Sequence, residues 1–512
     1  MTFTRRRFLQ LSGAATAIPL LRNVSLAERK EPSALCQKLA ADPLRPQYHL
    51  LPASNWMNDP NGPIYFRGRY HMFYQYNPKG AVWGNMNWAH SSSSDMVYWR
   101  HEPIAISPSP SPKGFDSLGV FSGSAILDRG LPTMIYTGVM PPASDAEITL
   151  RDDQHQWREV QCLAVSHDPD LRTWEKVAEP AIAAPPEGME ITGFRDPSAW
   201  REGNSWLLAL GSGIRGKAGA ILLYESSDLR HWTYLHPLFE GVPKKDVGDM
   251  WECPDFFPLD GKHVLLVSTE GKVHWRVGTY KDRRFSPEKE GVADWGAFYA
   301  AKSMVNEDDE RILWGWIPEK RPEAEHNAAG WAGVMSLPRL LSINSDGELQ
   351  MEVVPALRKL RHGHTGFKSQ DGPDALRKAL DSIRIEDLSA EISAEFHLKT
   401  DQPFTLHLRS EDGERFAAIS CVENSGKRLL KVNDVAAPLH GSGALPIRLE
   451  VFLDGSVLEV IASGTTALTA RVYTVPKWPL QVSFDGDGQV DSLDVWRMHS
   501  ISKDRLTGSL CG

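Results

Sequence analysis

The chain has 512 residues, which exceeds one ordinary domain and predicts two. Its net charge of -9, with no run of Lys and Arg beyond the first residues, argues against a nucleic-acid partner. The five cysteines are widely spaced and form no Cys-x-x-Cys pair, so we expect no structural zinc site. We also expect no other metal and no cofactor.

The first residues are typical of an export signal rather than of a folded domain. The basic segment Thr4–Gln10 leads into an apolar run, Leu9–Leu21, and Ser25–Ala27 is a small-x-small cleavage site. The apolar run is too short and too interrupted to span a membrane. We therefore predict a twin-arginine signal peptide at residues 1–27 and a mature protein that is periplasmic or secreted and has no membrane contact. A basic disordered tail is the alternative.

Residues 28–45 are expected to form an irregular arm, and the pattern is all-β from residue 46 to 345. Short aromatic and β-branched runs alternate there with turns rich in Gly, Pro, Asn and Asp, and long helical periodicity is absent. Examples of such runs are Ile64–Phe66, Tyr70–Tyr74 and Ser205–Leu210.

One pattern recurs three times in this region: a strand-like run, a turn that contains an aspartate, and then a tryptophan. Its copies are Ser94–Trp99, Asp168–Trp174 and Ser227–Trp232. In an all-β chain, repeats that are several tens of residues apart indicate a β-propeller with one such hairpin in each blade. The spacing is irregular and does not fix the number of blades.

Residues 346–386 predict a linker with short helical pieces, because leucines there stand among Arg, Lys and Asp. Strands return over residues 387–512, and many alternate apolar and polar side chains as half-solvated strands of a β-sandwich do. The expected strands are Leu388–Leu398, Phe404–Leu408, Ile447–Phe452, Val457–Ile461 and Leu468–Tyr473. We expect a supporting role for this second domain, since no acid in it stands in a catalytic type of motif.

Three carboxylates stand close to a proline in apolar, aromatic surroundings: Asp59 in Trp56–Gly62, Asp196 in Phe194–Pro197, and Glu252 in Trp251–Pro254. Each has a structural explanation when taken alone. Asp-Pro-Asn-Gly predicts a rigid turn, and Arg195 with Asp196 predicts a local ion pair. Together the three predict a preorganised carboxylate site, and two carboxylates that flank one bond are the minimum for glycoside hydrolysis. A nucleophilic Cys253 is a rival interpretation, although no Cys-His arrangement is near in the sequence.

These motifs, in this order, resemble glycoside hydrolase family 32, the β-fructofuranosidases, which include invertases, fructan exohydrolases, inulinases and levanases. The resemblance is strong over residues 46–345 and extends to six further segments: Phe73–Pro78, Trp83–His90, Phe121–Ser124, Asp294–Ala300, Leu313–Trp316 and Gly330–Gly333. It implies a five-bladed β-propeller catalytic domain, with the acids at the axial end of its central channel, followed by a C-terminal β-sandwich.

The resemblance also implies roles for single residues. Asp59 would be the nucleophile that forms a covalent fructosyl-enzyme, Glu252 the acid/base, and Asp196 a transition-state stabiliser that binds fructose hydroxyls. Arg195 would orient these acids. The implied sugar contacts are Asn58 and Gln75, an apolar wall of Trp56, Trp83 and Phe121, and further contacts from Ser122 and Asp294. The implied reaction is retaining hydrolysis of terminal non-reducing β-D-fructofuranosyl units from sucrose or from fructans such as inulin, levan and fructo-oligosaccharides.

Two alternatives stay open. A fructosyltransferase would use the same acids, and a non-catalytic sugar-binding propeller should have lost at least one of them. Two departures from the family pattern concern the leaving-group side: Ala297 stands where sucrose-preferring plant invertases carry Lys, and Asn87 replaces a residue that is often His in bacterial members. The preference between sucrose and fructans, the choice of exo or endo action and the oligomeric state therefore stay open.

Overall fold

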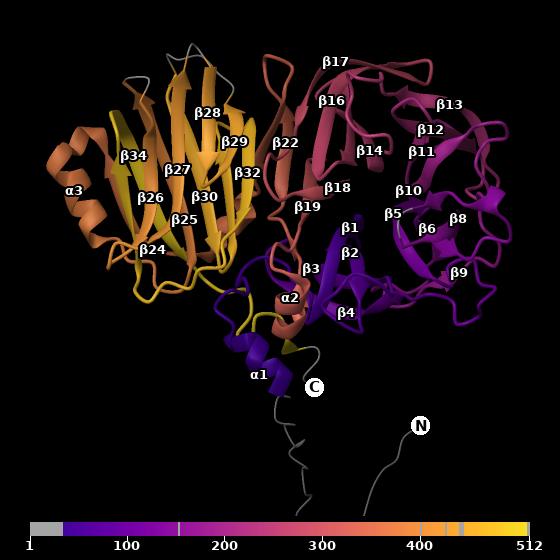
Figure 1. Cartoon of the computed structure of the whole chain (residues 1–512), viewed down its shortest axis with the longest axis horizontal. Coiled ribbons are helices and arrows are strands. Elements are labelled where there is room, and N and C mark those ends of the chain that lie inside the picture. The colour runs from indigo at the N-terminus through magenta and orange to yellow at the C-terminus, as the bar shows by residue number, and fades with distance from the viewer. Residues whose placement is uncertain (1–33, 152–153, 400–401, 425–426, 440–444, 509–512) are drawn as a thin grey trace, which may run out of the picture.

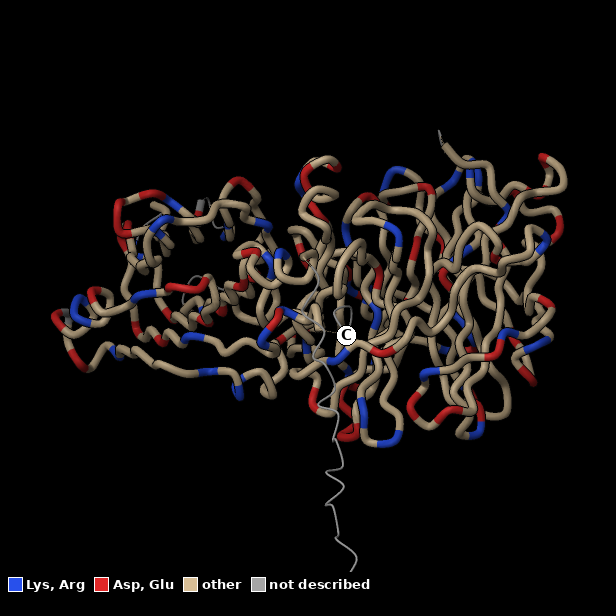
Figure 2. The backbone as a smooth tube through the Cα atoms, turned by 90° about the horizontal axis from the view of Figure 1, so that it is seen from below, with Lys and Arg blue, Asp and Glu red and all other residues tan. Residues whose placement is uncertain are grey.

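The computed structural model describes residues 34–151, 154–399, 402–424, 427–439 and 445–508. The expected signal peptide, residues 1–27, lies outside these residues. The described part of the chain forms seven β-sheets, three α-helices and three short 3₁₀ helices, which confirms the all-β class. Five sheets come from residues 55–353 and two from residues 361–498, and the two groups lie side by side (Figure 1). Acidic and basic residues are interspersed over both groups (Figure 2).

Each of the five sheets in the first group starts from one strand that the next strands extend in antiparallel order. The first sheet contains β1 (Asn55–Phe66), β2 (Arg69–Asn77), β3 (Asn87–Ser93), β4 (Trp99–Ile106) and β20 (Trp331–Ala332). The second contains β5 (Gly119–Asp128), β6 (Leu131–Met140), β7 (Leu150–Arg151), β8 (Gln156–Val165) and β9 (Glu175–Lys176). The third contains β10 (Ile191–Glu202), β11 (Ser205–Ile214), β12 (Gly219–Ser226) and β13 (Thr233–Glu240). The fourth contains β14 (Glu252–Leu259), β15 (Lys262–Thr269), β16 (Lys272–Lys281) and β17 (Arg284–Val292). The fifth contains β18 (Tyr299–Val305), β19 (Arg311–Ile317), β21 (Val334–Met335), β22 (Arg339–Ile343) and β23 (Leu349–Val353).

The first strands of these five sheets contact one another in a closed cycle. β1 contacts β5, β5 contacts β10, β10 contacts β14, β14 contacts β18, and β18 contacts β1. Two consecutive short strands close this cycle. β20 pairs in parallel with β1, and β21, which follows it directly, pairs with β19. The last sheet is thereby tied to the first.

The recurring pattern found in the sequence is one turn built three times, between β3 and β4, β8 and β9, and β12 and β13. In each copy the aspartate (Asp95, Asp168 or Asp228) accepts backbone N–H groups from residues that follow it. The tryptophan indole donates to the carbonyl three residues earlier, at 3.0, 2.9 and 2.7 Å. The residues that own these carbonyls have φ values of 62°, 57° and 65°. The two side chains thus hold a left-handed residue that is not glycine, and the predicted recurring hairpin is confirmed.

The second group consists of two antiparallel sheets that share one large apolar core. One sheet contains β24 (Arg361–Lys368), β25 (Ser389–Leu398), β30 (Ile447–Asp454), β31 (Val457–Ala462), β32 (Thr466–Arg471) and β34 (Gly488–Met498). The other contains β26 (Phe404–Ser410), β27 (Arg415–Asn424), β28 (Lys427–Val432), β29 (Val435–Leu439) and β33 (Leu480–Asp485). All five strands expected from the alternation of side chains are present.

Two expectations about connecting segments need correction. The arm at residues 28–45 is not irregular throughout, because α1 (Ala34–Ala41) buries Cys36 and Leu39 against the domain. The linker at residues 346–386 contains β23 of the fifth sheet and β24 of the next domain, so the boundary falls close to the 3₁₀ helix η2 (Pro355–Leu360). The remaining helices are η1 (Asp145–Glu147), α2 (Glu323–Ala329), η3 (Ser369–Asp371) and α3 (Pro373–Ser382). Among the residues that the structure describes, no helix is long and apolar enough to cross a bilayer.

Candidate active site

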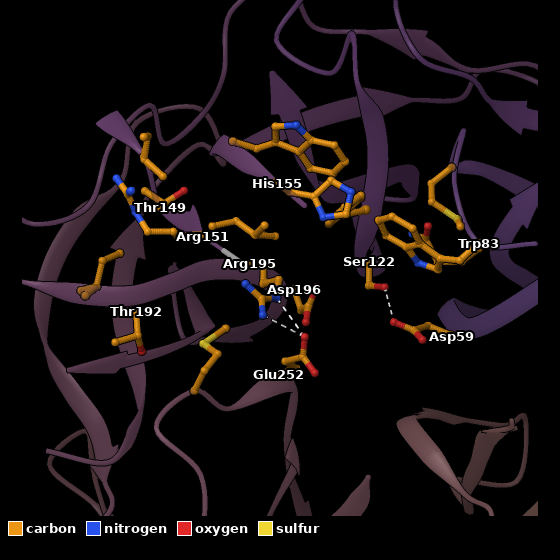
Figure 3. Close-up of a pocket in the computed structure, with 18 of the residues that line it drawn as sticks. Asp59, Trp83, Ser122, Thr149, Arg151, His155, Thr192, Arg195, Asp196 and Glu252 are labelled. Carbon is orange, nitrogen blue, oxygen red and sulfur yellow. Dashed lines mark hydrogen bonds and ion pairs between the residues drawn. The ribbon is translucent and has the colours of Figure 1, made fainter. Parts of the chain in front are cut away.

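A pocket of about 660 Å³ is lined by at least one residue from the first strand of each of the five sheets. These lining residues include Asp59 on β1, Ser122 on β5, Asp196 on β10, Glu252 on β14 and Tyr299 on β18. The three predicted acids therefore come together in one cavity, although they are far apart in the sequence (Figure 3).

Each of these five strands shifts register where it reaches the pocket. The shifts fall between Met57 and Pro60, Val120 and Gly123, Arg195 and Ser198, Glu252 and Asp255, and Tyr299 and Lys302. Such a bulge leaves a residue unpaired and re-aims the side chains beside it. Proline is tolerated at a bulge because no ladder N–H is needed there, which accounts for the proline close to each acid. The segment Asp59–Gly62 is consequently interior to β1 and is not the rigid turn that its residues predict.

The carboxylate of Asp59 is oriented by two donors. The Ser122 hydroxyl donates to Oδ2 at 2.6 Å, and the Asn58 amide donates to Oδ1 at 3.0 Å. The indole N–H of Trp56 donates to the Asn58 carbonyl oxygen at 2.7 Å and fixes the direction of that amide. Burial raises the pKa of Asp59, and the charge of Glu252 adds to this, while the two donors act in the opposite direction.

Glu252 is held at both oxygens. Two nitrogens of Arg195, Nε and Nη2, donate to Oε1 at 3.0 and 2.9 Å, and the Tyr299 hydroxyl donates to Oε2 at 2.6 Å. The third nitrogen of Arg195 donates at 2.9 Å to Glu159, a fully buried carboxylate on β8. Burial alone disfavours the charged guanidinium, but the carboxylates around it outweigh burial and raise the pKa of Arg195. Arg195 therefore stays charged and bridges Glu252 in the pocket and the buried Glu159.

Asp196 accepts contacts from Cys253, a buried residue that also lies close to Asp59. The backbone N–H of Cys253 donates to Asp196 Oδ2 at 2.9 Å, and its thiol lies 3.4 Å from the same oxygen and 3.6 Å from Asp59 Oδ2. Burial and the charges of Glu252 and Asp59 raise the pKa of Asp196 to about 7, against the opposing effect of Arg195. Burial, followed by the charges of Asp196 and Asp59, raises the pKa of the Cys253 thiol, so the thiolate that a nucleophilic Cys requires is disfavoured.

Comparison with known proteins identifies the family. The family model described as the glycosyl hydrolases family 32 N-terminal domain matches residues 49–353, and the family 32 C-terminal model matches residues 356–497. The chain belongs to glycoside hydrolase family 32. It is therefore a glycoside hydrolase, as its resemblance to this family predicts.

Two curated relatives and one solved structure illustrate the relationship. This family 32 chain is 34% identical over 458 residues to the sucrose-6-phosphate hydrolase of Escherichia coli, in an alignment that covers 84% of the chain and 90% of that protein. It is 38% identical over 389 residues to the cell wall β-fructofuranosidase of Zea mays, which covers 69% of the chain and 62% of the plant protein. The crystal structure of fructan 1-exohydrolase IIa from Cichorium intybus in complex with 1-kestose matches with a TM-score of 0.76 and 28% identity, over 90% of this chain and 98% of the other.

The outer part of the family 32 pocket is aromatic. Trp83 is 43% exposed and forms an edge-to-face contact with Phe121 at 5.9 Å, and both line the pocket together with Gln75. Trp157 stacks against Trp83, with ring centroids 6.4 Å apart and planes 17° apart. Trp56 does not itself line the pocket; it packs behind Asn58 at 5.8 Å from Trp316, which does.

Several residues of this family 32 pocket are not among the predicted sugar contacts, and two predicted contacts, Trp56 and Asp294, do not line it. The unpredicted pocket residues include Tyr299, His155, Trp157 and Trp316, and Glu159, which does not line the pocket, is fully buried against Arg195. Tyr299 and Trp316 lie inside segments that carry the family resemblance, whereas the others carry no local signal. The prediction that Asp294 contacts sugar is wrong. Its side chain is fully buried, and its Oδ2 accepts from Arg339 at 2.8 Å and from Thr469 of the second domain at 2.6 Å. Ala297 is also buried and does not line the pocket.

Proposed function

We propose that this protein is a retaining β-fructofuranosidase that releases terminal non-reducing β-D-fructofuranosyl units through a covalent fructosyl-enzyme on Asp59. The proposal is based on two carboxyl groups that lie in one pocket and that are oriented by different hydrogen-bond donors. Asn58 and Ser122 orient Asp59, while Arg195 and Tyr299 orient Glu252. Independent support for two carboxyl groups suits two different roles, one as nucleophile and one as acid/base.

In the first step, a carboxylate oxygen of Asp59 forms a bond to C2 of the fructosyl unit while the bond from C2 to the leaving oxygen breaks. Glu252 gives its proton to that oxygen. In the second step, Glu252 takes a proton from water, the water oxygen bonds to C2, and the ester bond to Asp59 breaks. The two steps together hydrolyse one glycosidic bond with retention of configuration.

Asp196 is suited to bind hydroxyl groups of the fructosyl unit. Its pKa of about 7 reflects burial among other carboxylates, with Arg195 and the N–H of Cys253 as opposing influences. Fructose hydroxyls would supply further donors to this carboxylate and favour its charged form. A charged Asp196 would then stabilise the positive charge that develops at C2 in the transition state.

We propose unphosphorylated sucrose and short fructans as the substrates. The outer lining of the pocket contains two arginines and two aspartates, namely Arg151, Arg215, Asp145 and Asp249. Arg215 also lies 3.6 Å from Glu190 in an exposed ion pair. Such a balanced set offers no concentrated positive charge for a phosphate group, whereas the aromatic rings of Trp83 and Trp157 suit the apolar faces of further sugar units.

We further propose that the five sheets are the blades of a five-bladed β-propeller and that the two C-terminal sheets form a β-sandwich. The closed cycle of first strands supports the propeller, and the shared apolar core supports the sandwich. A separate proposal concerns residues 1–27. Because a basic segment leads there into an apolar one, we propose a twin-arginine signal that sends the enzyme to the periplasm or the medium.

Product analysis tests the proposed function. The purified protein would be incubated separately with sucrose, 1-kestose, inulin, levan and sucrose 6-phosphate, and the sugars would be followed over time. We expect free fructose as the first product from sucrose and 1-kestose, little turnover of the phosphorylated sugar, and no early release of long fragments from polymers. Longer oligosaccharides at high sucrose would indicate the fructosyltransferase instead, and no fructose from any of the five substrates would refute the proposal.

A further inference from the structure

The segment that leads into β18 is attached to the C-terminal domain by main-chain bonds. The N–H of Trp295 donates to Ala467 O at 2.9 Å, and the N–H of Ala297 donates to Thr469 O at 2.7 Å. This segment therefore runs along β32, the strand of the second domain that Figure 1 shows beside β22. Gly296 permits the close approach, since a Cβ built there would lie 1.8 Å from the carbonyl oxygen of Thr469.

Asp294 fixes the start of this segment. Its Oδ1 accepts the backbone N–H groups of Gly296 and Thr469, each at 2.8 Å, and its Oδ2 accepts the Thr469 hydroxyl at 2.6 Å. Arg339 donates to Asp294 at 2.8 Å and to Glu459 of the second domain at 2.6 Å. These side chains are buried almost completely, so each depends on the others for its hydrogen bonds.

The far end of the same segment reaches the pocket. Phe298 is fully buried, with the guanidinium carbon of Arg339 4.5 Å from the centre of its ring. Tyr299 follows directly, and its hydroxyl donates to Glu252 Oε2 at 2.6 Å. Phe298 directly precedes Tyr299 in the chain, so its burial against Arg339 holds the backbone from which the Tyr299 side chain extends.

We infer that the C-terminal domain takes part in catalysis through this segment. Thr469 and Asp294 are positioning residues: they hold residues 294–298 against β32, and this places the Tyr299 hydroxyl so that Glu252 points at the leaving oxygen. The inference rests on the proposed role of Glu252 as acid/base, and it gives the second domain a function beyond support.

The test compares a poor and a good leaving group. Thr469→Val keeps the shape of the side chain and the main-chain bonds but removes the hydroxyl that donates to Asp294. We expect Thr469→Val and Tyr299→Phe each to lower kcat/KM for sucrose by roughly 10- to 100-fold, with most of the loss in kcat, because small misplacement of a catalytic group is costly. The loss for p-nitrophenyl β-D-fructofuranoside should be several-fold smaller, because its departure needs little protonation. The double variant should lose no more than Tyr299→Phe alone, since both act on one contact.

Thr466→Val is the matched control. Thr466 lies on the same strand, is equally buried, and donates its hydroxyl to Pro438 O at 2.8 Å within the second domain. It should leave the ratio of the two substrates unchanged, and Thr469→Ser should restore the ratio of the wild type. If Thr469→Val does not fold, Asp294→Asn, which keeps the side-chain shape, must show the same selective loss.

Equal losses on both substrates, or an unchanged rate on sucrose in a folded variant, would overturn the inference while the proposed function stands. If the wild-type enzyme cleaves neither substrate, the proposed function itself fails.

Discussion

The stability of this enzyme should fall as pH rises above neutrality, because of one buried histidine. The His49 ring lies between two carboxylates of the second domain, with Nδ1 2.8 Å from Asp454 and Nε2 2.9 Å from Glu459. All three side chains have no exposed surface. Burial alone would lower the pKa of His49, yet the hydrogen bonds and charges of the two carboxylates raise it to about 9.

The size of this change in stability follows from the pKa of His49 in the unfolded state and in the folded state. An unfolded histidine titrates near pH 6.5, so a folded pKa of about 9 corresponds to about 3 kcal/mol in the free energy of unfolding. Because the folded state binds the proton more tightly, this contribution is fully present below about pH 6.5 and is lost as pH rises through about 9.

Urea unfolding between about pH 6 and pH 10 would measure this directly. His49→Gln should be less stable than wild type at pH 6, by about 3 kcal/mol, since removing one member of a buried charged set is costly. The difference between the two proteins should shrink towards pH 10. His167→Gln is the control, because His167 is exposed, and it should follow wild type throughout. A difference between wild type and His49→Gln that stays constant over the whole range would refute the reasoning.

Three further predictions concern catalysis, substrate choice and export. Glu252→Gln should slow sucrose hydrolysis by several orders of magnitude but should slow the first step of aryl fructoside hydrolysis much less. Azide should restore part of the turnover by attacking the fructosyl-enzyme. Equal losses on both substrates without an azide effect would contradict an acid/base role. Trp157→Ala should raise KM for 1-kestose more than for sucrose, by roughly 10-fold, since its ring stacks with Trp83 at the outer pocket; equal effects on the two sugars would exclude a contact with further sugar units. Replacing Arg5 and Arg6 with Lys should leave active enzyme in the cytoplasm, as fractionation would show, and unchanged export would refute the twin-arginine signal.

The parts of the fold that the sequence predicts are those with a local cause. The strand pattern of the second domain follows from alternation of side chains, and the repeated turn follows from an aspartate and a tryptophan at a fixed distance. The sequence does not predict α1 in the arm or β24 in the linker, because both are stabilised by contacts with residues far away in the chain. Leu39 of α1, for example, packs in the same apolar cluster as Trp331.

The candidate site shows the same division. The sequence correctly predicts the three acids but wrongly predicts a turn at Asp59–Gly62. The bulges that accommodate Pro60 inside β1 depend on pairing with β2, which the local sequence does not show. Glu159 has no motif of its own, and only the approach of β8 to β10 brings it to Arg195. Asp294 belongs to a segment that resembles the family, yet the buried charge of Arg339 draws its side chain away from the pocket.

The most direct test of the central claim is to trap the covalent intermediate. Glu252→Gln would be mixed with an aryl β-D-fructofuranoside, whose good leaving group lets the first step proceed while the second step lacks its base. Mass spectrometry of the denatured protein and its peptides would then locate any added sugar. We expect one fructosyl unit on the peptide that contains Asp59, and none when Asp59→Asn is added. A fructosyl unit on another residue, or turnover with inversion of configuration and no adduct, would contradict this expectation.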